Sequence, residues 1–383
     1  MRLGVYTDYA YHLVDGRPHA ERAFALFIAA LAATGIERVV VLGRLDPSPA
    51  GGRYPLGGVE FAALPFYPKL TAVLPALRGM AGSLRRFWRA LDGLDTVWLL
   101  GPHPLALVFA AIALTRRRRV VLGVRQQFVA YLGNRHPGSR VASLLARLLE
   151  GAFRLLARRC DVIVVGPAIA ADYRRSHRLL EISVSLVHAE EIATEGEISA
   201  RSYGGELTAL SVGRLDREKN PLALADVLAR LNQDERRWRL VVCGEGSLSG
   251  ALAERLEALG QADRAELRGY VPHGHGLDEA YRRSSALLHV SWTEGLPQVL
   301  FEAFAAGIPV VATAVGGVRD AVGGAALLVE PGDPEAAAAA LERIAREPEL
   351  RDSLIAGGLS LVRRSTIEVE SARVGEFLAP PSG

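Results

Sequence analysis

Short runs of β-branched and other apolar residues alternate with longer apolar helical stretches along almost the whole chain. Strands of a parallel sheet that is covered by helices on both faces read as nearly continuous hydrophobic runs, because both sides of each strand are buried. The alternation therefore predicts α/β domains with doubly wound parallel sheets. At 383 residues the chain is too long for one ordinary core, and it suits two such domains of nearly equal size.

The expected elements fall into two sets, one in each half of the chain. In the first half, strands are expected at residues 3–7, 38–42, 96–100, 120–124 and 162–165, and helices at 18–33, 105–114 and 141–157. In the second half, strands are expected at 207–212, 240–243, 286–290, 309–312 and 326–329, and helices at 221–231, 248–259, 297–306 and 334–346.

A polar, glycine-rich stretch at residues 190–205 marks the expected domain boundary. The sequence thus predicts a first domain at 1–190, a second at 205–364, and a C-terminal helix within 365–383 that crosses back to the first domain.

Composition excludes several classes of protein. A net charge of +3 does not indicate nucleic-acid binding, and two cysteines in different halves do not make a disulfide framework. The N-terminus runs directly into a strand and lacks the pattern of a signal peptide, and the apolar runs are too short to cross a bilayer. A cytoplasmic location is expected.

The segment 211–220 places two cations on the loop between a strand and a helix. Arg214 and Lys219 follow the strand that ends at Gly213, and Asn220 is expected to cap the helix that starts at Pro221. Ligands of parallel sheets bind beyond the carboxyl ends of the strands, and a helix N-terminus favours anions. The segment predicts an anion site, with a solvated charged loop as the alternative.

The segment 291–302 repeats this strand–loop–helix pattern with carboxylates. Glu294 precedes the helix, and Gly295 lets the backbone approach a ligand closely. Glu302 falls inside an apolar helix, where an unpaired carboxylate would be costly, so it needs hydrogen-bond donors. Ribose hydroxyls would supply them, and an ion pair with Arg319 is the alternative.

These segments resemble a known family. Glu294 and Glu302, with seven residues between them, resemble the E-x7-E motif of retaining GT-B glycosyltransferases of the family 4 type, also called glycosyl transferases group 1. Residues 211–220 resemble that family's VGRL-x3-KN segment, and 242–246, 267–272 and 307–313 match in the same order. The resemblance implies the GT-B fold, in which two doubly wound Rossmann-like domains face each other across a cleft.

The resemblance also implies roles for individual residues. Arg214 and Lys219 would hold the donor diphosphate and stabilise the leaving nucleoside diphosphate, Glu294 would bind the donor sugar, and Glu302 the ribose. The donor-binding residues would further include Gly16, Gly244, Tyr270, Val271, Gly295, Leu296, Gln298 and Val299, with Tyr270 and Val271 against the base. The chain has no Asp-x-Asp, which agrees with catalysis without a metal or other cofactor.

The first half departs from the family pattern at two places. The family has a Gly-Gly turn after the first strand, whereas the loop expected at 12–18 has only Gly16. The family also has a histidine near the donor sugar, where this chain has Arg125. Arg125 is predicted to be catalytic through its charge, and a strand-end ion pair is the alternative.

Two basic clusters lie at 85–89 and 116–119, the first with Phe87 and Trp88 between its arginines. They suggest a peripheral contact with the inner face of a membrane, and a solvated helix face is the alternative.

The function predicted from these observations is retaining transfer of a sugar from a nucleotide diphosphate-sugar to a hydroxyl acceptor, in the synthesis of a polysaccharide, glycolipid or other glycoconjugate. The first domain would bind the acceptor, which in related enzymes is often lipid-linked, and the second domain would bind the donor. Two alternatives remain open: a catalytically silent sugar-nucleotide-binding partner of a glycan assembly complex, and a phosphorolytic or hydrolytic enzyme on the same fold.

Overall fold

The computed structural model describes residues 1–48, 52–68, 73–125, 128–129, 139–235, 237–272 and 274–379, which form two compact units. The first unit comprises Met1–Leu186 and Ile367–Gly383, and the second comprises Val187–Thr366. The polar stretch at 190–205 thus lies at the start of the second unit, and the C-terminal helix belongs to the first. Among the described residues, no helix is long and apolar enough to cross a membrane.

The first unit is built on a mostly parallel sheet with β1 (Arg2–Val14) in its middle. β1 pairs in parallel with β3 (Arg38–Leu45) on one side and with β6 (Thr96–Gly101) on the other. Beyond these two neighbours the sheet continues to β5 on one side and through β7 and β8 to β9 on the other. The remaining strands are β2 (Arg17–Ala20), β4 (Tyr54–Pro55), β5 (Glu60–Leu64), β7 (Arg119–Val124), β8 (Asp161–Val165) and β9 (Arg178–Ile182).

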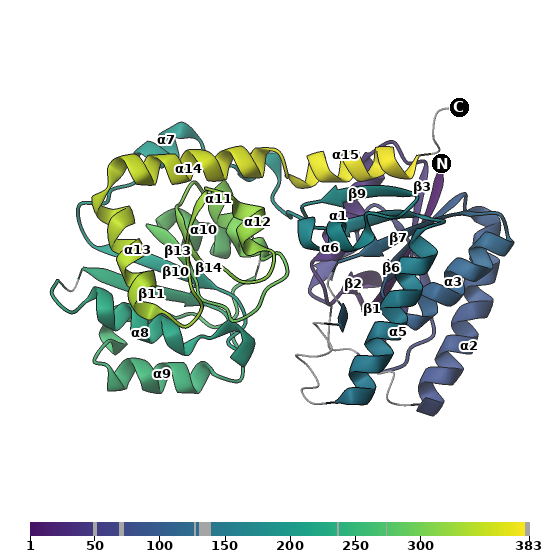
Figure 1. Ribbon diagram of the computed structural model, residues 1–383, viewed down its shortest axis with the longest axis horizontal. Coiled ribbons are helices and arrows are strands. Elements are labelled where there is room, and N and C mark those ends of the chain that lie inside the picture. Colours follow the sequence, from purple (N-terminus) through teal and green to yellow (C-terminus); the bar gives the residue numbers. More distant parts are fainter. Residues whose placement is uncertain are drawn as a thin grey trace. The chain divides into compact units, whose positions relative to one another are not determined.

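Helices cover both faces of this sheet, because alternate residues of its strands enter two separate cores. Tyr6 and Leu99 belong to one core, whereas Val5 and Leu100 belong to the other. The helices α2 (Val73–Ala90), α3 (Pro104–Thr115), α5 (Arg140–Ala157) and α6 (Pro167–Tyr173) pack on the first face. The second face carries α1 (Phe24–Ala30), η1 (Leu31–Ala33) and α15 (Ile367–Leu378), and Figure 1 shows α15 beside α1. A short turn of helix, η2 (Leu91–Gly93), follows α2.

The loop expected at 12–18 is wrong. β1 continues to Val14 and turns back into the antiparallel β2, with Val14 opposite Arg17. Asp15 and Gly16 both have positive φ, 50° and 75°, as a two-residue type I′ hairpin turn requires. Gly16 therefore lies at a hairpin tip, and the helix expected from residue 18 begins only at Phe24. A role for Gly16 at a donor phosphate stays a prediction.

The membrane contact expected from the basic cluster at 85–89 also needs correction. Phe87 is fully buried and stacks on Phe109 in the core, so it is not part of a surface. Trp88 is half exposed, and the guanidinium of Arg116 covers its ring at 4.6 Å.

The second unit is built on a six-stranded parallel sheet in the order β12-β11-β10-β13-β14-β15. The strands are β10 (Leu207–Val212), β11 (Trp238–Cys243), β12 (Ala265–Leu267), β13 (Ala286–His289), β14 (Val310–Thr313) and β15 (Ala326–Val329). From β10 the chain first proceeds outward through β11 to β12, and then returns to place β13 on the other side of β10. This reversal makes the β10/β13 edge the topological switch point, where open α/β sheets bind ligands.

Helices also surround this sheet (Figure 1). They are α7 (Glu195–Ser199), α8 (Leu222–Leu231), α9 (Ser249–Ala258), α10 (His275–Arg283), α11 (Gln298–Ala305), α12 (Val318–Val322), α13 (Pro334–Arg346) and α14 (Pro348–Arg363), with short turns at η3 (Ala189–Glu191), η4 (Arg217–Lys219) and η5 (Ala262–Arg264). The prediction of two doubly wound α/β domains is confirmed.

Candidate functional site

Loops that follow four strands of the second unit meet at the carboxyl edge of the sheet. The N–H of Gly213 donates to the carbonyl of Cys243 (3.0 Å), which holds the loop after β10 against the loop after β11. The N–H of Trp292 donates to the carbonyl of Glu218 (2.9 Å), which holds the loop after β13 against η4. The two segments singled out in the sequence are thus adjacent at the switch point.

Glycines allow this close approach of backbones. A Cβ atom on Gly244 would lie 1.7 Å from the carbonyl oxygen of Gly213. A Cβ atom on Gly316 would lie 2.0 Å from the carbonyl oxygen of Glu294, and Gly316 has a φ of 53°. Any side chain at either position would force the loops apart, so the geometry of the site depends on these two residues.

The centre of the site is the buried carboxylate of Glu294. Its Oε1 accepts hydrogen bonds from Lys219 Nζ (2.6 Å) and His289 Nε2 (2.8 Å). Burial by itself would raise the pKa of Glu294, but the hydrogen bond from His289 and the charge of Lys219 outweigh it and hold the pKa at about 2. Both contacts from described residues go to Oε1, which leaves Oε2 able to accept a hydrogen bond from a ligand hydroxyl.

His289 was not singled out in the sequence. It is the last residue of β13, and it is buried. Because a carboxylate only accepts hydrogen bonds, the contact with Glu294 requires the proton to be on Nε2. Ser291 Oγ lies 3.2 Å from the same nitrogen, and Thr313 Oγ1 donates to the carbonyl of Ser291 (2.7 Å), which fixes this loop against β14.

Arg214 does not take part in this network. Its guanidinium binds two carboxylates of its own loop, Asp216 (2.5 Å) and Glu218 (2.6 Å), and 64% of its side chain is exposed. Asp216 is held in turn by the N–H and hydroxyl of Ser247, which lower its pKa. Arg214 is therefore held by local ion pairs, and its exposure leaves it accessible to an anion.

The expected helix cap at Asn220 is wrong. Asn220 has a left-handed backbone (φ 52°) and ends η4, while α8 begins after Pro221 without a side-chain cap. The left-handed residue turns the chain sharply between Lys219 and the helix. The anion site consequently depends on the turn and its side chains rather than on a capped helix.

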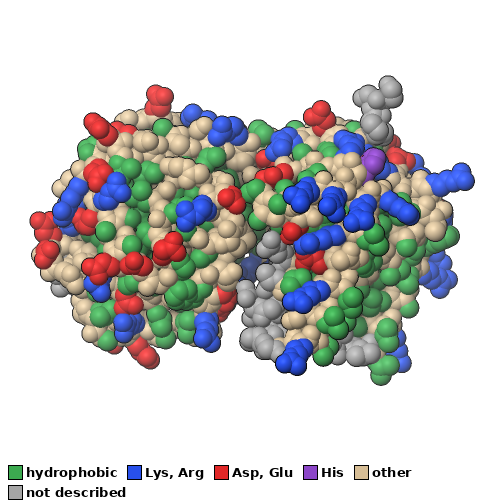
Figure 2. All heavy atoms as spheres, viewed as in Figure 1, with side chains coloured by type: hydrophobic (Ala, Val, Ile, Leu, Met, Phe, Trp, Pro, Cys, Tyr) green, Lys and Arg blue, Asp and Glu red, His purple; other side chains and the backbone are tan. Residues whose placement is uncertain are grey.

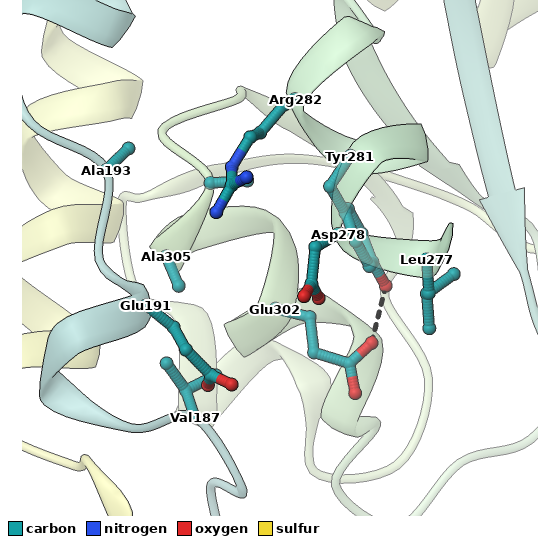
Figure 3. Close-up of a pocket in the computed structure, with 10 residues that line it drawn as sticks. Val187, Glu191, Ala193, Leu277, Asp278, Tyr281, Arg282, Glu302 and Ala305 are labelled. Atoms are coloured by element: carbon teal, nitrogen blue, oxygen red, sulfur yellow. Dashed lines mark hydrogen bonds between the residues drawn. The ribbon is translucent and has the colours of Figure 1, made fainter. Parts of the chain in front are cut away.

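Glu302 points into a pocket formed within the second unit (Figure 3). Its Oε2 accepts a hydrogen bond from the hydroxyl of Tyr281 (2.7 Å). Burial, together with the charge of Glu302, raises the pKa of Tyr281 well above its ordinary value, so the phenol stays protonated and donates. Two further carboxylates line the pocket, Glu191 and Asp278. Arg319, considered as an ion-pair partner of Glu302, instead pairs with Glu330 (3.8 Å).

Four more residues of the predicted donor set lie between Glu294 and Glu302 in the chain, and two lie after β12. Gly295, Leu296, Gln298 and Val299 occupy the loop after Glu294 and the first turn of α11. Leu296, Val299 and Val271 pack partly against the core, whereas the side chain of Tyr270 is 40% exposed. A ring as exposed as that of Tyr270 is accessible to a planar base.

Arg125 lies in the first unit, directly after β7. Its guanidinium stacks on the ring of Phe24, 3.8 Å from the centroid, and burial lowers its pKa to about 10. Within the described parts of the chain no carboxylate pairs with Arg125, which does not support the strand-end ion pair. Residues 126 and 127, which follow it, lie outside the described residues. The catalytic role of Arg125 stays a prediction.

Within the described ranges, no group of three or more His, Cys, Asp or Glu side chains could hold a metal ion. Metal independence of the reaction stays a prediction.

Residues 196–359, almost the whole of the second unit, match the family model described as glycosyl transferases group 1. The second unit belongs to the glycosyl transferases group 1 family. The match includes Arg214, Lys219, Glu294 and Glu302, and it therefore covers both carboxylates and both cations of the candidate site.

Two curated relatives illustrate the extent of the similarity. A D-inositol 3-phosphate glycosyltransferase of Frankia alni is 38% identical over 161 residues, which are 39% of this chain and 39% of that protein. A 2-deoxystreptamine N-acetyl-D-glucosaminyltransferase of Streptomyces fradiae is 30% identical over 286 residues, 69% of this chain and 64% of that protein. For the first four curated relatives, the match spans only 36% to 41% of their length.

The similarity in fold extends over the whole chain. The crystal structure of Anabaena HepE in complex with UDP matches with a TM-score of 0.71, at 16% identity, over 99% of both chains. Solved glycosyltransferases match over similar lengths, so the group 1 domain is the second half of a GT-B fold.

Proposed function

We propose that this chain is a retaining glycosyltransferase that transfers a sugar from a nucleotide diphosphate-sugar to a hydroxyl acceptor. The observation that carries the proposal is the shared carboxylate of Glu294, which joins Lys219 and His289 at the switch point of a group 1 domain. The second unit binds the donor, and the first binds the acceptor. The product is a polysaccharide, glycolipid or other glycoconjugate.

The two cations serve the diphosphate in different ways. Lys219 is held in place by Glu294 before any ligand arrives, so it loses little conformational freedom when it contacts a phosphate. Arg214 is exposed, and among the described residues its ion-pair partners are Asp216 and Glu218, so it exchanges these partners for phosphate oxygens when the donor binds. Together the two cations stabilise the charge that develops on the leaving nucleoside diphosphate.

The two carboxylates serve hydroxyl groups. Glu294 presents Oε2 to a hydroxyl of the donor sugar, while its Oε1 is occupied by Lys219 and His289. His289 is a positioning residue, because it acts on the sugar only through Glu294. Glu302 lies in a pocket with Glu191 and Asp278, and the pocket is also lined by Arg282. The three carboxylates outnumber this one cation, and this excess of acceptors suits the ribose diol rather than a phosphate.

The donor is expected to be a UDP-sugar. Structures of Anabaena HepE contain UDP and UDP-glucose, and HepE matches this chain in fold along its whole length. The acceptor is a hydroxyl compound, and the names of the relatives include D-inositol 3-phosphate, 2-deoxystreptamine and an undecaprenol-linked glycan. Transfer is expected to persist in EDTA, because Lys219 and Arg214 supply the charge that a divalent ion supplies elsewhere.

Binding and transfer test the proposal separately. UDP, GDP and ADP are titrated into the wild type and into Lys219→Ala, with Arg343→Ala, an exposed arginine of α13, as the control. We expect UDP to bind the wild type and the control with equal affinity. The affinity of Lys219→Ala for UDP should be lower by tenfold or more, or about 1.4 kcal/mol or more, because a charged contact is lost.

Transfer is then measured as radiolabel moved from UDP-glucose to any acceptor in a cell extract. Unchanged nucleotide binding in Lys219→Ala would contradict the phosphate site. Normal nucleotide binding without transfer to any acceptor would instead favour the catalytically silent binding partner.

A further inference from the structure

Helix α5 of the first unit carries a row of large apolar side chains on its exposed face. Val141, Leu144, Leu145, Leu148 and Leu155 are 58% to 69% exposed. Their spacing of three, four and seven residues places them in one stripe along the helix. The opposite side of α5 is the buried one and packs into the core through Ala146, Phe153 and Ala157. The stripe is thus a second apolar face that the fold of this unit leaves uncovered.

Neighbouring helices on the same face also expose large apolar side chains. α5 packs beside α3, and α3 packs beside α2, on the same face of the sheet. Val108 of α3 and Leu74 and Leu77 of α2 are also exposed, by 40% to 68%. Large contiguous apolar surfaces are uncommon on soluble proteins and mark sites that contact a partner or a membrane.

Arginines flank the stripe. Successive residues of a helix are rotated by about 100°, which places Arg140, Arg147, Arg154 and Arg158 along one side of the apolar row. Figure 2 shows Lys and Arg side chains beside the hydrophobic ones over the part of the first unit where α5 lies in Figure 1. The helix is therefore basic as well as apolar on its outer surface.

A cavity of about 530 Å³ lies at the C-terminal end of this surface, between α5 and the end of α6 with the residues that follow it. Four arginines line it, Arg154, Arg158, Arg174 and Arg175, against one carboxylate, that of Asp172. Asp172 pairs with Arg154 (3.1 Å). In the part of the chain that the structure describes, no ion pair engages Arg158, Arg174 or Arg175. The cavity consequently has an excess of positive charge available to an anionic group.

We propose that the α5 face, defined as the apolar stripe of α5 together with Arg154, Arg158, Arg174 and Arg175, binds the surface of an anionic membrane. The leucines enter the boundary between head groups and acyl chains, and the arginines contact lipid phosphates. A second copy of the chain would present the same basic surface, which is not complementary in charge to these arginines. The charge of the cavity therefore favours an anionic lipid surface.

Sedimentation with lipid vesicles tests this proposal directly. The protein is mixed at low salt with vesicles of phosphatidylcholine alone, or of equal parts phosphatidylcholine and phosphatidylglycerol. We expect at least about tenfold stronger binding to the anionic vesicles, and a loss of that preference at high salt. No nucleotide or turnover enters this measurement, so it can fail without affecting the proposed function, and the proposed function can fail without affecting it.

Paired variants locate the contact. Leu144→Ser with Leu148→Ser removes part of the apolar stripe, and Arg158→Gln with Arg175→Gln removes part of the charge. Each pair is expected to weaken binding to anionic vesicles by about tenfold or more. Because all four side chains are exposed, the melting temperature should not change, which serves as the folding check. Arg343→Gln with Arg346→Gln, on α13 of the second unit, is the matched control for charge, and Leu267→Ser on β12 is the control for apolar surface.

Three results would overturn the proposal. The first is equal binding to neutral and anionic vesicles. The second is unchanged binding in both α5 pairs. The third is a dimer in light scattering that Leu144→Ser with Leu148→Ser dissociates, because it would place a second copy on the α5 face.

Discussion

Lys219 Nζ lies 2.6 Å from Glu294 Oε1, which joins the loop after β10 to the loop after β13 through one oxygen atom. The sequence suggested separate tasks for these residues, one at the phosphate and one at the sugar. In the structure they form a single charged pair that is only 23% and 7% exposed. A change in either residue therefore also removes a hydrogen-bond and charge partner of the other.

The first prediction concerns stability at low pH. The pKa of Glu294 is about 2 in the folded protein and about 4.5 ordinarily, so this carboxylate stabilises the fold above pH 4.5 and loses that contribution as the pH falls toward 2. Glu294→Gln should lower the free energy of unfolding near neutral pH by at most roughly 3 kcal/mol, and the unfolding temperature should fall accordingly. At pH 3 the difference in stability between the variant and the wild type should be smaller. Scanning calorimetry at both pH values measures the two unfolding temperatures, and Glu335→Gln, which changes an exposed carboxylate, is the control. A gap independent of pH would contradict the shifted pKa.

The second prediction concerns the point charge of Lys219. Lys219→Ala should lower kcat/KM by a factor that corresponds to about 2–4 kcal/mol of lost transition-state stabilisation, which is the effect of removing one preorganised donor. Lys219→Arg should also be impaired, because a planar guanidinium cannot keep the position of an ammonium beside both Glu294 and a phosphate. Steady-state kinetics measures both variants. Full activity in Lys219→Ala would remove this residue from the phosphate site.

The third prediction gives the two glutamates opposite effects on nucleotide affinity. Glu302→Gln should weaken binding of free UDP, because an amide is a poorer acceptor for ribose hydroxyls. Glu294→Gln should strengthen UDP binding by about fivefold while lowering turnover, because Lys219 loses its counter-charge. Titration calorimetry on both variants measures the affinities. If Glu294→Gln weakens UDP binding and Glu302→Gln does not, the assigned roles are reversed.

The fourth prediction concerns the close approach of loops at Gly244. Gly244→Ala should destabilise the second unit by at least about 2 kcal/mol, because its Cβ would overlap the backbone carbonyl of Gly213, which cannot move aside as a flexible side chain can. Gly250→Ala is the matched control. Gly250 lies in α9 with no atom within 4 Å of the added Cβ, so alanine there should stabilise by about 0.5–1 kcal/mol. Equal melting temperatures for the two variants would contradict the geometry of this loop.

The fifth prediction concerns Arg125. If its charge serves the reaction, Arg125→Gln should lower turnover by one to three orders of magnitude, about 1.4 kcal/mol for each factor of ten. Because Arg125 stacks on the ring of Phe24, its replacement could also lower activity by destabilising the fold. The melting temperature of the variant must therefore first be shown to equal that of the wild type. Arg125→His introduces the histidine that the family pattern has at this position, and it should not raise activity if the site requires a cation. Wild-type turnover in a well-folded Arg125→Gln would assign this residue to packing alone.

Local patterns accounted for much of the second unit. The residues predicted for β10, β15 and α13 agree with the structure at both ends, because apolar runs and flanking Gly, Asp and Pro residues define them without help from distant parts of the chain. The β1–β2 hairpin was missed although Asp15 and Gly16 are a strong type I′ signal, because the family's glycine loop was expected there. The prediction that Asn220 caps a helix was wrong because asparagine suits two roles. Its side chain suits a helix cap, but in this turn the residue adopts a left-handed backbone, which asparagine tolerates.

The sequence by itself determined the two doubly wound sheets and predicted Lys219, Glu294 and Glu302 as site residues, because hydrophobic periodicity and motif spacing are local properties of the chain. Only the tertiary structure decided how these residues are partnered. The contacts of Glu294 with Lys219 and of Glu302 with Tyr281 join segments that meet only when the sheet has formed. The tertiary structure also decided which side of α5 is buried, because the helix has apolar residues on both sides and its inner side is selected by the shape of the core that receives Phe153.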